Sequence, residues 1–208
     1  MPKILEITKY TKIKNCFKVV FDNDSSLLID ADTVVLFGLK KDLFVDEQLF
    51  KKISEHNTAN RITSYAFYLI SHKMFSKKGL TDKLLAKGFN LCDIEKVINR
   101  FCELNYINDE NFAKEFIRYL KNKGKGPFYI KNELKIHGID DELIKQLLSD
   151  NDEENYLQIV DLIKKKFPGF NGNDKNKVRK VAMFFQRRGF CSSDIAKAIK
   201  TCEAEILE

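Results

Sequence analysis

Apolar residues recur at helical spacing from about residue 60 onward, and three glycines give them a common register. Gly88, Gly138 and Gly189 lie 50 and 51 residues apart. Counted from each glycine, five positions are apolar in all three copies: −8 (Leu80, Ile130, Val181), −4 (Leu84, Leu134, Phe185), +1 (Phe89, Ile139, Phe190), +6 (Ile94, Ile144, Ile195) and +10 (Ile98, Leu148, Ile199). Periods of this length are typical of stacked helical units, so the pattern predicts an internal repeat.

The spacing around each glycine has a mechanical explanation. Positions −8 and −4 share one face of a helix, and a glycine after the last turn can take the left-handed conformation that ends the helix. In that arrangement the residue at +1 packs on the residue at −4. Asn90, Asp140 and Ser192 then cap a second helix, which buries positions +6 and +10.

A further helix precedes each pair, because apolar residues with a 3.6-residue period run through 62–74, 109–120 and 156–167. The prediction is a mainly α-helical protein with three tandem three-helix repeats, over 59–107, 108–150 and 151–208. Units of this kind contact mainly their neighbours, so we expect an elongated, curved body.

The N-terminal extension, residues 1–58, has the pattern of short strands. β-Branched and aromatic residues fill 4–7, 17–21 and 27–29, and the polar run 22–25 is typical of a turn. We predict a small antiparallel meander within 3–31, followed by short helices at 32–36 and 46–53. Such a sheet is too small to be stable alone and has to pack on another element.

Composition narrows the class of protein. Hydrophobic residues make up 44% of the 208 residues and charged residues 32%, which suits a packed core with a well-solvated surface. No apolar run approaches the roughly 18–20 residues that span a bilayer. The N-terminus also lacks the pattern of a secretory signal. We expect a cytoplasmic monomer.

The cysteines and histidines indicate neither a disulfide framework nor a zinc site. The five cysteines, at 16, 92, 102, 191 and 202, are odd in number and form no CxxC pair. The three histidines, at 56, 72 and 137, are never three or four residues apart. We therefore expect no metal and no cofactor.

The net charge of +6 is mild, but the charge is unevenly distributed. Residues 114–137 carry a net +5, residues 140–155 a net −6 and residues 156–190 a net +7. Basic stretches interrupted by an acidic one are typical of a surface that binds a polyanionic or mixed-charge partner.

Two basic clusters supply the candidate contact residues. The first contains Lys121, Lys123, Lys125, Phe128, Tyr129, Lys131 and Lys135, and the second contains Arg179, Lys180, Arg187 and Arg188. Lysines beside aromatic faces suit phosphate contact and base stacking, but Phe128 and Tyr129 can equally belong to the core of the second repeat. Arg187 and Arg188 can equally complement the dipole of the helix that they end.

Enzyme chemistry has little support in the sequence. The carboxylates of 109–110, 140–142 and 152–154 stand at predicted helix starts, where they cap the helix and complement its dipole. The segment 123–126 (KGKG) lacks the GxxxxGK[ST] spacing of a P-loop. No Ser/His/Asp or Cys/His set has the context of a nucleophilic site, so we predict no enzymatic activity.

The second repeat resembles the RecX family, regulators of the bacterial recombinase RecA. The resemblance rests on 106–110 (YINDE), Phe112, Ala113, Phe116, Ile117, 123–127 (KGKGP), Ile130, Glu133, Leu134, Gly138 and Ile139. Ala66, Leu69, Leu85, 87–89 (KGF) and Ile94 also match, so the strongest similarity covers 62–148 and the third repeat fits more loosely. Leu120 departs from the pattern, because many members of the family have a basic residue near this position.

The resemblance implies a non-enzymatic regulator with three three-helix repeats. Such a protein lies in the helical groove of the RecA filament on DNA, bridges protomers, blocks or destabilises filament growth, and so inhibits the recombinase and modulates DNA repair and the SOS response. Weak, non-specific binding to single- and double-stranded DNA is implied as well, through the basic clusters. Two alternatives stay open: a sequence-tolerant DNA-binding module that acts without a recombinase, and a repeat scaffold for acidic protein partners.

Overall fold

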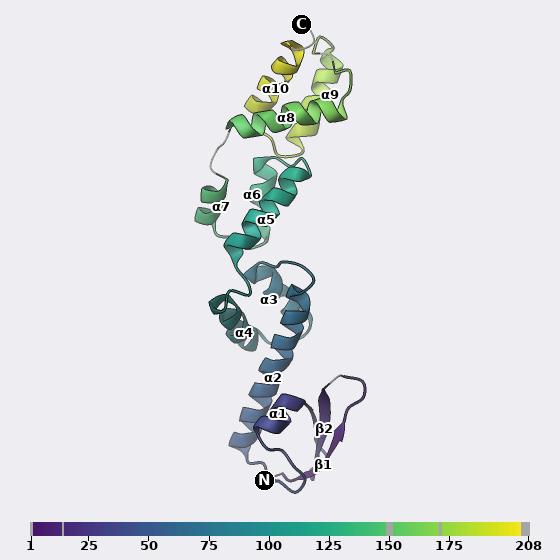
Figure 1. The fold of residues 1–208 in the computed structure, drawn as a ribbon, viewed down its shortest axis with the longest axis vertical. Helices are drawn as coiled ribbons and strands as arrows, with labels where there is room; N and C mark the ends of the chain where they lie inside the picture. Colours follow the sequence, from purple (N-terminus) through teal and green to yellow (C-terminus); the bar gives the residue numbers. More distant parts are fainter. Residues whose placement is uncertain (1, 14, 149–151, 171, 205–208) are drawn as a thin grey trace. The chain divides into compact units, whose positions relative to one another are not determined.

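The computed structural model describes residues 2–13, 15–148, 152–170 and 172–204, which form three strands and ten helices. Contacts divide the chain into two compact units. Unit 1 comprises Met1–Met74 and Leu80–Tyr106, and unit 2 comprises Phe75–Gly79 and Ile107–Glu208. Figure 1 shows the strands beside α1 and α2 in unit 1, and α5 to α10 in unit 2.

Unit 1 begins with an antiparallel sheet of β1 (Ile4–Lys9), β2 (Cys16–Phe21) and β3 (Ser26–Asp30), in the order β1-β2-β3. The register pairs Lys9 with Phe17 and Cys16 with Asp30. One face is buried with the side chains of Ile4, Val19, Phe21, Ile29, Leu39, Val45 and Ile53. The predicted meander is confirmed, and it packs on the helix that carries Ile53.

The helix after the sheet begins at a polar cap. α1 (Ala31–Leu36) follows β3 directly, and the Asp30 carboxylate accepts hydrogen bonds from the Thr33 N–H at 2.9 Å and the Thr33 hydroxyl at 2.6 Å. A side-chain acceptor at this position satisfies an N–H group that has no partner within the helix. The short helix predicted at 32–36 is therefore present.

The next helix is longer than the sequence predicted. α2 runs from Glu47 to Ile70, so the helices predicted at 46–53 and 62–74 are one helix, and the boundary predicted at 58/59 falls inside it. The residues between the two predicted helices are largely polar, and one of them, Asn57, forms hydrogen bonds to the sheet. Buried Asn57 accepts a hydrogen bond from the Asp30 N–H at 3.0 Å and donates one to the Leu28 carbonyl at 2.9 Å. The polar stretch joins helix and sheet.

Three helix pairs carry the repeat. They are α3 (Lys77–Ala86) with α4 (Leu91–Glu103), α6 (Pro127–Ile136) with α7 (Asp141–Leu147), and α9 (Lys175–Gln186) with α10 (Ser192–Ala204). The helices that precede the pairs are α2, α5 (Asp109–Asn122) and α8 (Asp152–Lys166). Three three-helix repeats are confirmed, while the boundary predicted at 150/151 lies outside the described residues.

Each repeat glycine ends its helix as the spacing predicted. The backbone φ angles of Gly88, Gly138 and Gly189 are +94°, +76° and +84°. The N–H at position +1 donates to the carbonyl at −4 in every copy, from Phe89 to Leu84 at 3.4 Å, from Ile139 to Leu134 at 3.0 Å and from Phe190 to Phe185 at 3.2 Å. These bonds define a Schellman motif. Of the apolar repeat positions, all but the half-buried Phe89 and Leu148 are buried.

The predicted caps of the second helices are confirmed in two copies and wrong in the third. Asn90 accepts from the Asp93 N–H at 2.9 Å, and Asp140 accepts from the Glu142 N–H at 2.9 Å. Ser192 is already the first residue of α10, so it cannot occupy the capping position. The preceding Cys191 does so instead, with its Sγ 3.4 Å from the Asp194 nitrogen.

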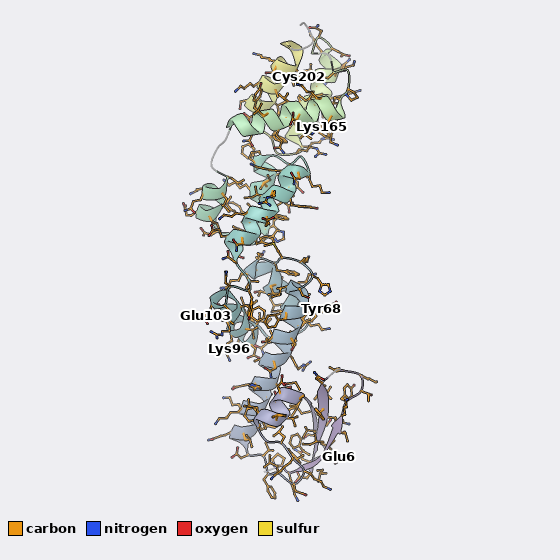
Figure 2. All side chains as sticks on the ribbon, viewed as in Figure 1. Glu6, Tyr68, Lys96, Glu103, Lys165 and Cys202 are labelled. Carbon is orange, nitrogen blue, oxygen red and sulfur yellow. The ribbon has the colours of Figure 1, made fainter. Side chains whose placement is uncertain are left out.

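Charged side chains cover the outer faces of the helices. Lys96 and Glu103, labelled in Figure 2, lie on the exposed side of α4, opposite the buried Ile94 and Ile98. No helix among the described residues is long and apolar enough to cross a membrane. None of the five cysteines forms a disulfide.

Candidate functional site

The two basic clusters of the sequence meet within unit 2, where the start of α6 lies against the turn that follows α9. The Gly126 N–H donates to the Arg188 carbonyl at 2.8 Å, and the Phe128 N–H donates to the Gly189 carbonyl at 3.0 Å. We call this contact between residues 126–129 and 187–190 the joint. It pairs N–H groups at the start of α6, which have no partner within the helix, with backbone carbonyls of the turn that follows α9.

The backbones at the joint are too close for side chains. A Cβ on Gly126 would lie 2.5 Å from the Gly189 carbonyl oxygen, and a Cβ on Gly189 would lie 2.3 Å from the Tyr129 nitrogen. Real Cβ atoms do not approach so closely, so both positions require glycine. Gly126 therefore serves close packing between the two segments.

Arg188 has a structural role in the joint. Its guanidinium donates to the carbonyls of Lys123 at 2.8 Å and Gly124 at 3.2 Å, and it lies 4.3 Å from the centroid of the Phe184 ring. The two carbonyls follow the last turn of α5, where a cation also complements the helix dipole. The structural role of Arg188 is therefore at the end of α5, whereas the sequence predicted it at the dipole of α9, the helix that Arg187 and Arg188 follow.

The lysines of the first cluster surround the joint with their side chains over aromatic rings. The Lys125 ammonium lies 3.7 Å from the centroid of the Tyr129 ring, and the Lys123 ammonium lies 5.6 Å from the centroid of the Tyr119 ring. Lys123 is exposed and Lys125 is half-buried. The half-buried Lys121 contributes its backbone, because its carbonyl accepts a hydrogen bond from Gln158 Nε2 of α8 at 2.7 Å.

Phe128 and Tyr129, adjacent in the sequence, have different surroundings. Phe128 is 61% exposed, whereas Tyr129 is half-buried against the core of the second repeat. A hydrogen bond to the Glu133 carboxylate raises the pKa of the Tyr129 hydroxyl above its ordinary value. The interpretation as a core residue is thus correct for Tyr129 and wrong for Phe128, whose ring remains available to a partner.

The two remaining lysines of the first cluster differ in their local charge. Lys135 forms an ion pair with Asp141 at 2.7 Å, and this contact lowers the pKa of the Asp141 carboxyl below its ordinary value. Lys131 is exposed and lines a hollow of about 390 Å³ together with Phe128 and Lys145. Lys131 therefore offers its charge to a partner more readily than Lys135 does.

The second cluster follows α9 to the joint. Arg179, Lys180 and Arg187 are exposed, and none of them forms an ion pair with a carboxylate in the part of the chain that the structure describes. Arg187 caps the C-terminal end of α9, and its neighbour Arg188 holds the turn beside Lys123. The basic ends of the two clusters are thus adjacent at the joint, although they lie 65 residues apart in the sequence.

A row of aromatic rings on α5 was not among the candidate residues. Phe112 stacks on Phe116 with centroids 5.4 Å apart, Phe116 stacks on Tyr119 at 6.2 Å, and the His137 ring lies 4.9 Å from Phe116. The spacing of these residues predicted a core face, and Phe112 is indeed buried. Tyr119 is 54% exposed beside Lys123, so the row reaches the surface next to the first cluster.

The carboxylates at the helix starts accept hydrogen bonds from backbone N–H groups. Asp109 accepts from the Lys77 N–H at 2.7 Å, and Asp140 caps α7. The side chains of 152–154 lie outside the described residues. Within the described ranges, no group of three or more His, Cys, Asp or Glu side chains is placed to hold a metal ion. The basic clusters and the exposed aromatic rings around the joint are suited to bind anions and aromatic groups.

Family models match most of the chain, and they do so repeat by repeat. The model described as the first three-helix domain of RecX matches residues 64–101, that of the second domain matches 108–148, and that of the third matches 152–199. The three matched ranges coincide with the three repeats of the structure.

Curated relatives and solved structures agree with the family models. The chain is 31% identical to the regulatory protein RecX of Bacillus velezensis and 30% identical to that of Bacillus subtilis, with 99% of this chain and 79% of each relative covered. A crystal structure of a regulatory protein RecX superimposes with a TM-score of 0.69 at 21% identity, over 97% of this chain and 100% of the other. That of RecX from Lactobacillus salivarius gives 0.62 at 27% identity, over 70% and 97%.

Proposed function

Because the chain belongs to the RecX family of regulatory proteins, we propose that it binds the RecA filament on DNA and inhibits the recombinase. It acts as a non-enzymatic, cytoplasmic monomer that lies in the helical groove of the filament and bridges RecA protomers. Its direct contacts with single- and double-stranded DNA are weak and do not depend on sequence.

The observation that carries this proposal is the meeting of the two basic clusters at the joint. Arg188 ties the end of α9 to the carbonyls of Lys123 and Gly124, so that Arg187 and Lys123 come from neighbouring segments of one packed contact. A group of cations fixed relative to one another suits the closely spaced phosphates of a nucleic-acid backbone. Lysines on segments that move independently would lose more conformational entropy on forming the same contacts.

The rings at the surface provide a second kind of contact. Phe128 and Tyr119 are more than half exposed, and each lies beside a lysine of the first cluster. Exposed aromatic side chains near cations stack on bases and also anchor protein interfaces. This surface can therefore contact both components of a filament, the DNA and the recombinase around it.

Binding through several repeats at once explains how individually weak contacts are enough to hold the protein on the filament. We assign the repeats to 59–107, 108–150 and 151–208, the first beginning within α2, and propose that each contacts a successive part of the filament. When one contact has formed, the others form at a high effective concentration, so the combined affinity exceeds that of any single repeat.

Charge reversal in the first cluster tests the proposal. We expect the combined Lys123→Glu, Lys125→Glu and Lys131→Glu variant to raise the concentration needed for half-inhibition of RecA strand exchange by about tenfold or more, because phosphate contacts become repulsive. The matched control is Lys40→Glu, Lys41→Glu and Lys52→Glu, which reverses three exposed lysines of unit 1. Undiminished inhibition by the first variant would remove this cluster from the binding surface.

The binding target separates the proposal from a DNA-binding module that acts without a recombinase. Binding of the wild-type protein is compared on bare single-stranded DNA and on RecA filaments at one salt concentration. Our proposal requires tighter binding to the filament. Equal binding to both targets, with a steep loss of affinity as salt rises, would support the DNA-binding module instead.

A further inference from the structure

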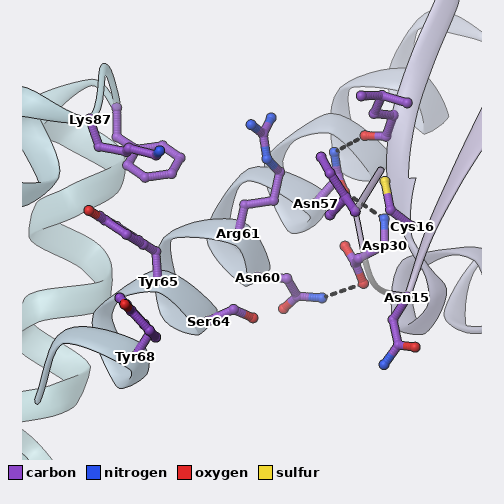
Figure 3. A pocket seen from close by; sticks show the side chains of 13 residues that line it. Asn15, Cys16, Asp30, Asn57, Asn60, Arg61, Ser64, Tyr65, Tyr68 and Lys87 are labelled. Carbon is purple, nitrogen blue, oxygen red and sulfur yellow. Dashed lines mark hydrogen bonds between the residues drawn. The ribbon is translucent and has the colours of Figure 1, made fainter. Parts of the chain in front are cut away.

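Unit 1 contains a cavity of about 370 Å³ that the proposed function does not use. Residues of α2 lie along its length, residues of the sheet and of the turn before β2 lie on one side, and Lys87 lies on the other (Figure 3). Phe89 also lines the cavity. All of the lining residues belong to unit 1. The cavity lies within the size range of sites for small organic ligands.

Arg61 projects from α2 between the two walls, as Figure 3 shows. Its guanidinium carbon lies 6.0 Å from the centroid of the Phe89 ring. Among the described residues it has no partner for a hydrogen bond or an ion pair. An exposed guanidinium inside a cavity retains its donors for an oxyanion, which it can bind through two parallel hydrogen bonds.

The carboxylate in the cavity wall does not compete for Arg61, because other groups already occupy it. Asp30 accepts from the Thr33 N–H and hydroxyl, and also from Asn60 Nδ2 at 3.1 Å. Lys87 adds a second cation on the opposite wall, with its ammonium 5.3 Å from the centroid of the Tyr65 ring. The cavity thus presents two available positive charges, which favours an anionic ligand.

The aromatic rings beside these cations indicate which chemical group the anionic ligand carries. Tyr65 and Tyr68 are nearly parallel, with an interplanar angle of 15° and centroids 6.2 Å apart, and Tyr68 is 59% exposed. The ring of Phe89 lies 6.5 Å from that of Tyr65. The exposed ring of Tyr68 and the neighbouring rings next to a guanidinium suit the flat π system of a nucleobase, which stacks on aromatic side chains regardless of sequence.

We propose that this cavity binds one nucleotide, with its phosphate on Arg61 and Lys87 and its base against Tyr65 and Tyr68. Ser64 and Asn15 line the same cavity and can donate to, or accept from, the edge of the base or the sugar. A carboxylate ligand without a ring would use the cations but leave the aromatic wall exposed. The site is independent of the RecA proposal, because its residues belong to unit 1 and its test needs no recombinase.

Direct binding to the full-length protein tests the site with two probes. One is thymidine 5′-monophosphate, followed by calorimetry, and the other is a short fluorescent oligothymidylate, followed by anisotropy. The oligonucleotide is measured in the Lys123→Glu, Lys125→Glu and Lys131→Glu background, so that these three lysines of the first cluster do not contribute. Binding of both probes points to a site for free nucleotides, and binding of the oligonucleotide alone points to a nucleotide within a strand.

Variants of the two walls show whether bound probe occupies the cavity. Arg61→Gln removes the guanidinium charge and Tyr65→Leu removes the stacking surface, so we expect each to weaken binding about tenfold. Arg61→Lys keeps a charge and Tyr65→Phe keeps a ring, and these variants should recover part of the affinity. Lys52→Gln is the matched control, since it removes an exposed cation of the same helix outside the cavity.

Two results would overturn the proposal. One is the absence of binding for both probes at millimolar concentration, and the other is equal affinity of wild type, Arg61→Gln and Tyr65→Leu. Circular dichroism of each variant distinguishes a lost site from a lost fold. If Tyr65→Leu unfolds unit 1, the comparison of Arg61→Gln with Arg61→Lys decides alone, because Arg61 is exposed and its replacement leaves the core intact.

Discussion

Gly126 and Gly189 lie in direct backbone contact between the second and third repeats, since a Cβ on Gly126 would stand 2.5 Å from the Gly189 carbonyl oxygen. The same carbonyl accepts the Phe128 N–H at 3.0 Å. The start of α6 and the turn after α9 thus form backbone hydrogen bonds to one another, with no side chain between them. The glycines fix the distance between two repeats as well as the end of a helix.

The first prediction concerns Gly126→Ala. Gly126 has a negative φ of −90°, so alanine adds no backbone strain, and any loss comes from the clash with the joint. We expect unfolding by urea to show a loss of about 1–3 kcal/mol in the free energy of unfolding of unit 2, typical of overpacking. Gly88→Ala is the comparison for Gly189→Ala, because both have positive φ but only Gly189 is crowded. Equal losses for that pair would contradict the role of close packing.

The local part of the fold could be predicted from the sequence, since helix ends depend on neighbouring residues. The register of Gly88, Gly138 and Gly189 correctly placed the Schellman motifs, because each motif needs only a glycine and apolar residues at −4 and +1. The continuity of α2 could not be predicted in this way. Asn57 is polar in sequence but buried in the fold, and its partners, Leu28 and Asp30, are set by the tertiary structure.

The sequence predicted which residues belong to the candidate site but not how they are arranged in space. Its basic residues were identified, yet nothing local indicates that Arg188 reaches the carbonyls of Lys123 and Gly124. One signal was present but was not used: Gly126 stands 12 residues before its repeat glycine, as Ser76 does in the first repeat. Both residues contact the turn of the next repeat, at Arg188 and His137 respectively. Equivalent positions in a repeat can thus indicate an interface.

The second prediction separates two adjacent arginines. Arg188→Gln should lower the free energy of unfolding by about 1.5–3 kcal/mol, because it removes charged hydrogen bonds to two backbone carbonyls. Arg187→Gln should change stability by less than about 0.5 kcal/mol, since Arg187 is exposed. We expect Arg187→Gln instead to weaken binding to RecA filaments. Urea unfolding and filament co-sedimentation of both variants check this, and an interchange of the two phenotypes would contradict our assignment.

The third prediction is a pH dependence at the start of α1. Burial raises the pKa of the Asp30 carboxyl. The hydrogen bonds from Thr33 and Asn60 together lower it by more than burial raises it, so the pKa lies below its ordinary value. A carboxylate with a lowered folded-state pKa stabilises the fold above its unfolded pKa of about 3.9, and this contribution is lost as the pH falls through the folded-state value.

Asp30→Asn therefore should cost about 1 kcal/mol of unfolding free energy near neutral pH and progressively less below about pH 4. Urea unfolding of wild type and variant over this pH range measures the difference. Asp24→Asn, in an exposed turn with φ of +59°, is the control, because asparagine tolerates this conformation. A gap between wild type and Asp30→Asn that widens in acid would refute the assigned direction.

The fourth prediction concerns Ser76, which occupies the place of Gly126 in the first repeat. Its hydroxyl donates to the His137 carbonyl at 2.8 Å and accepts from the Gly79 N–H at 3.0 Å, and the residue is 1% exposed. Ser76→Ala leaves both groups without this partner, so we expect unit 2 to lose about 1–3 kcal/mol of unfolding free energy.

Ser71→Ala is the matched control for this change. Ser71 also donates to a carbonyl, that of Tyr68 at 2.8 Å, but it is exposed, so water replaces the lost bond and stability should change by less than about 0.5 kcal/mol. Hydrogen exchange locates the effect: protection should fall at Gly79 in Ser76→Ala and stay unchanged in Ser71→Ala. Unaltered protection at Gly79 would mean that the hydroxyl does not hold this contact, because the Gly79 N–H would then have kept a partner without it.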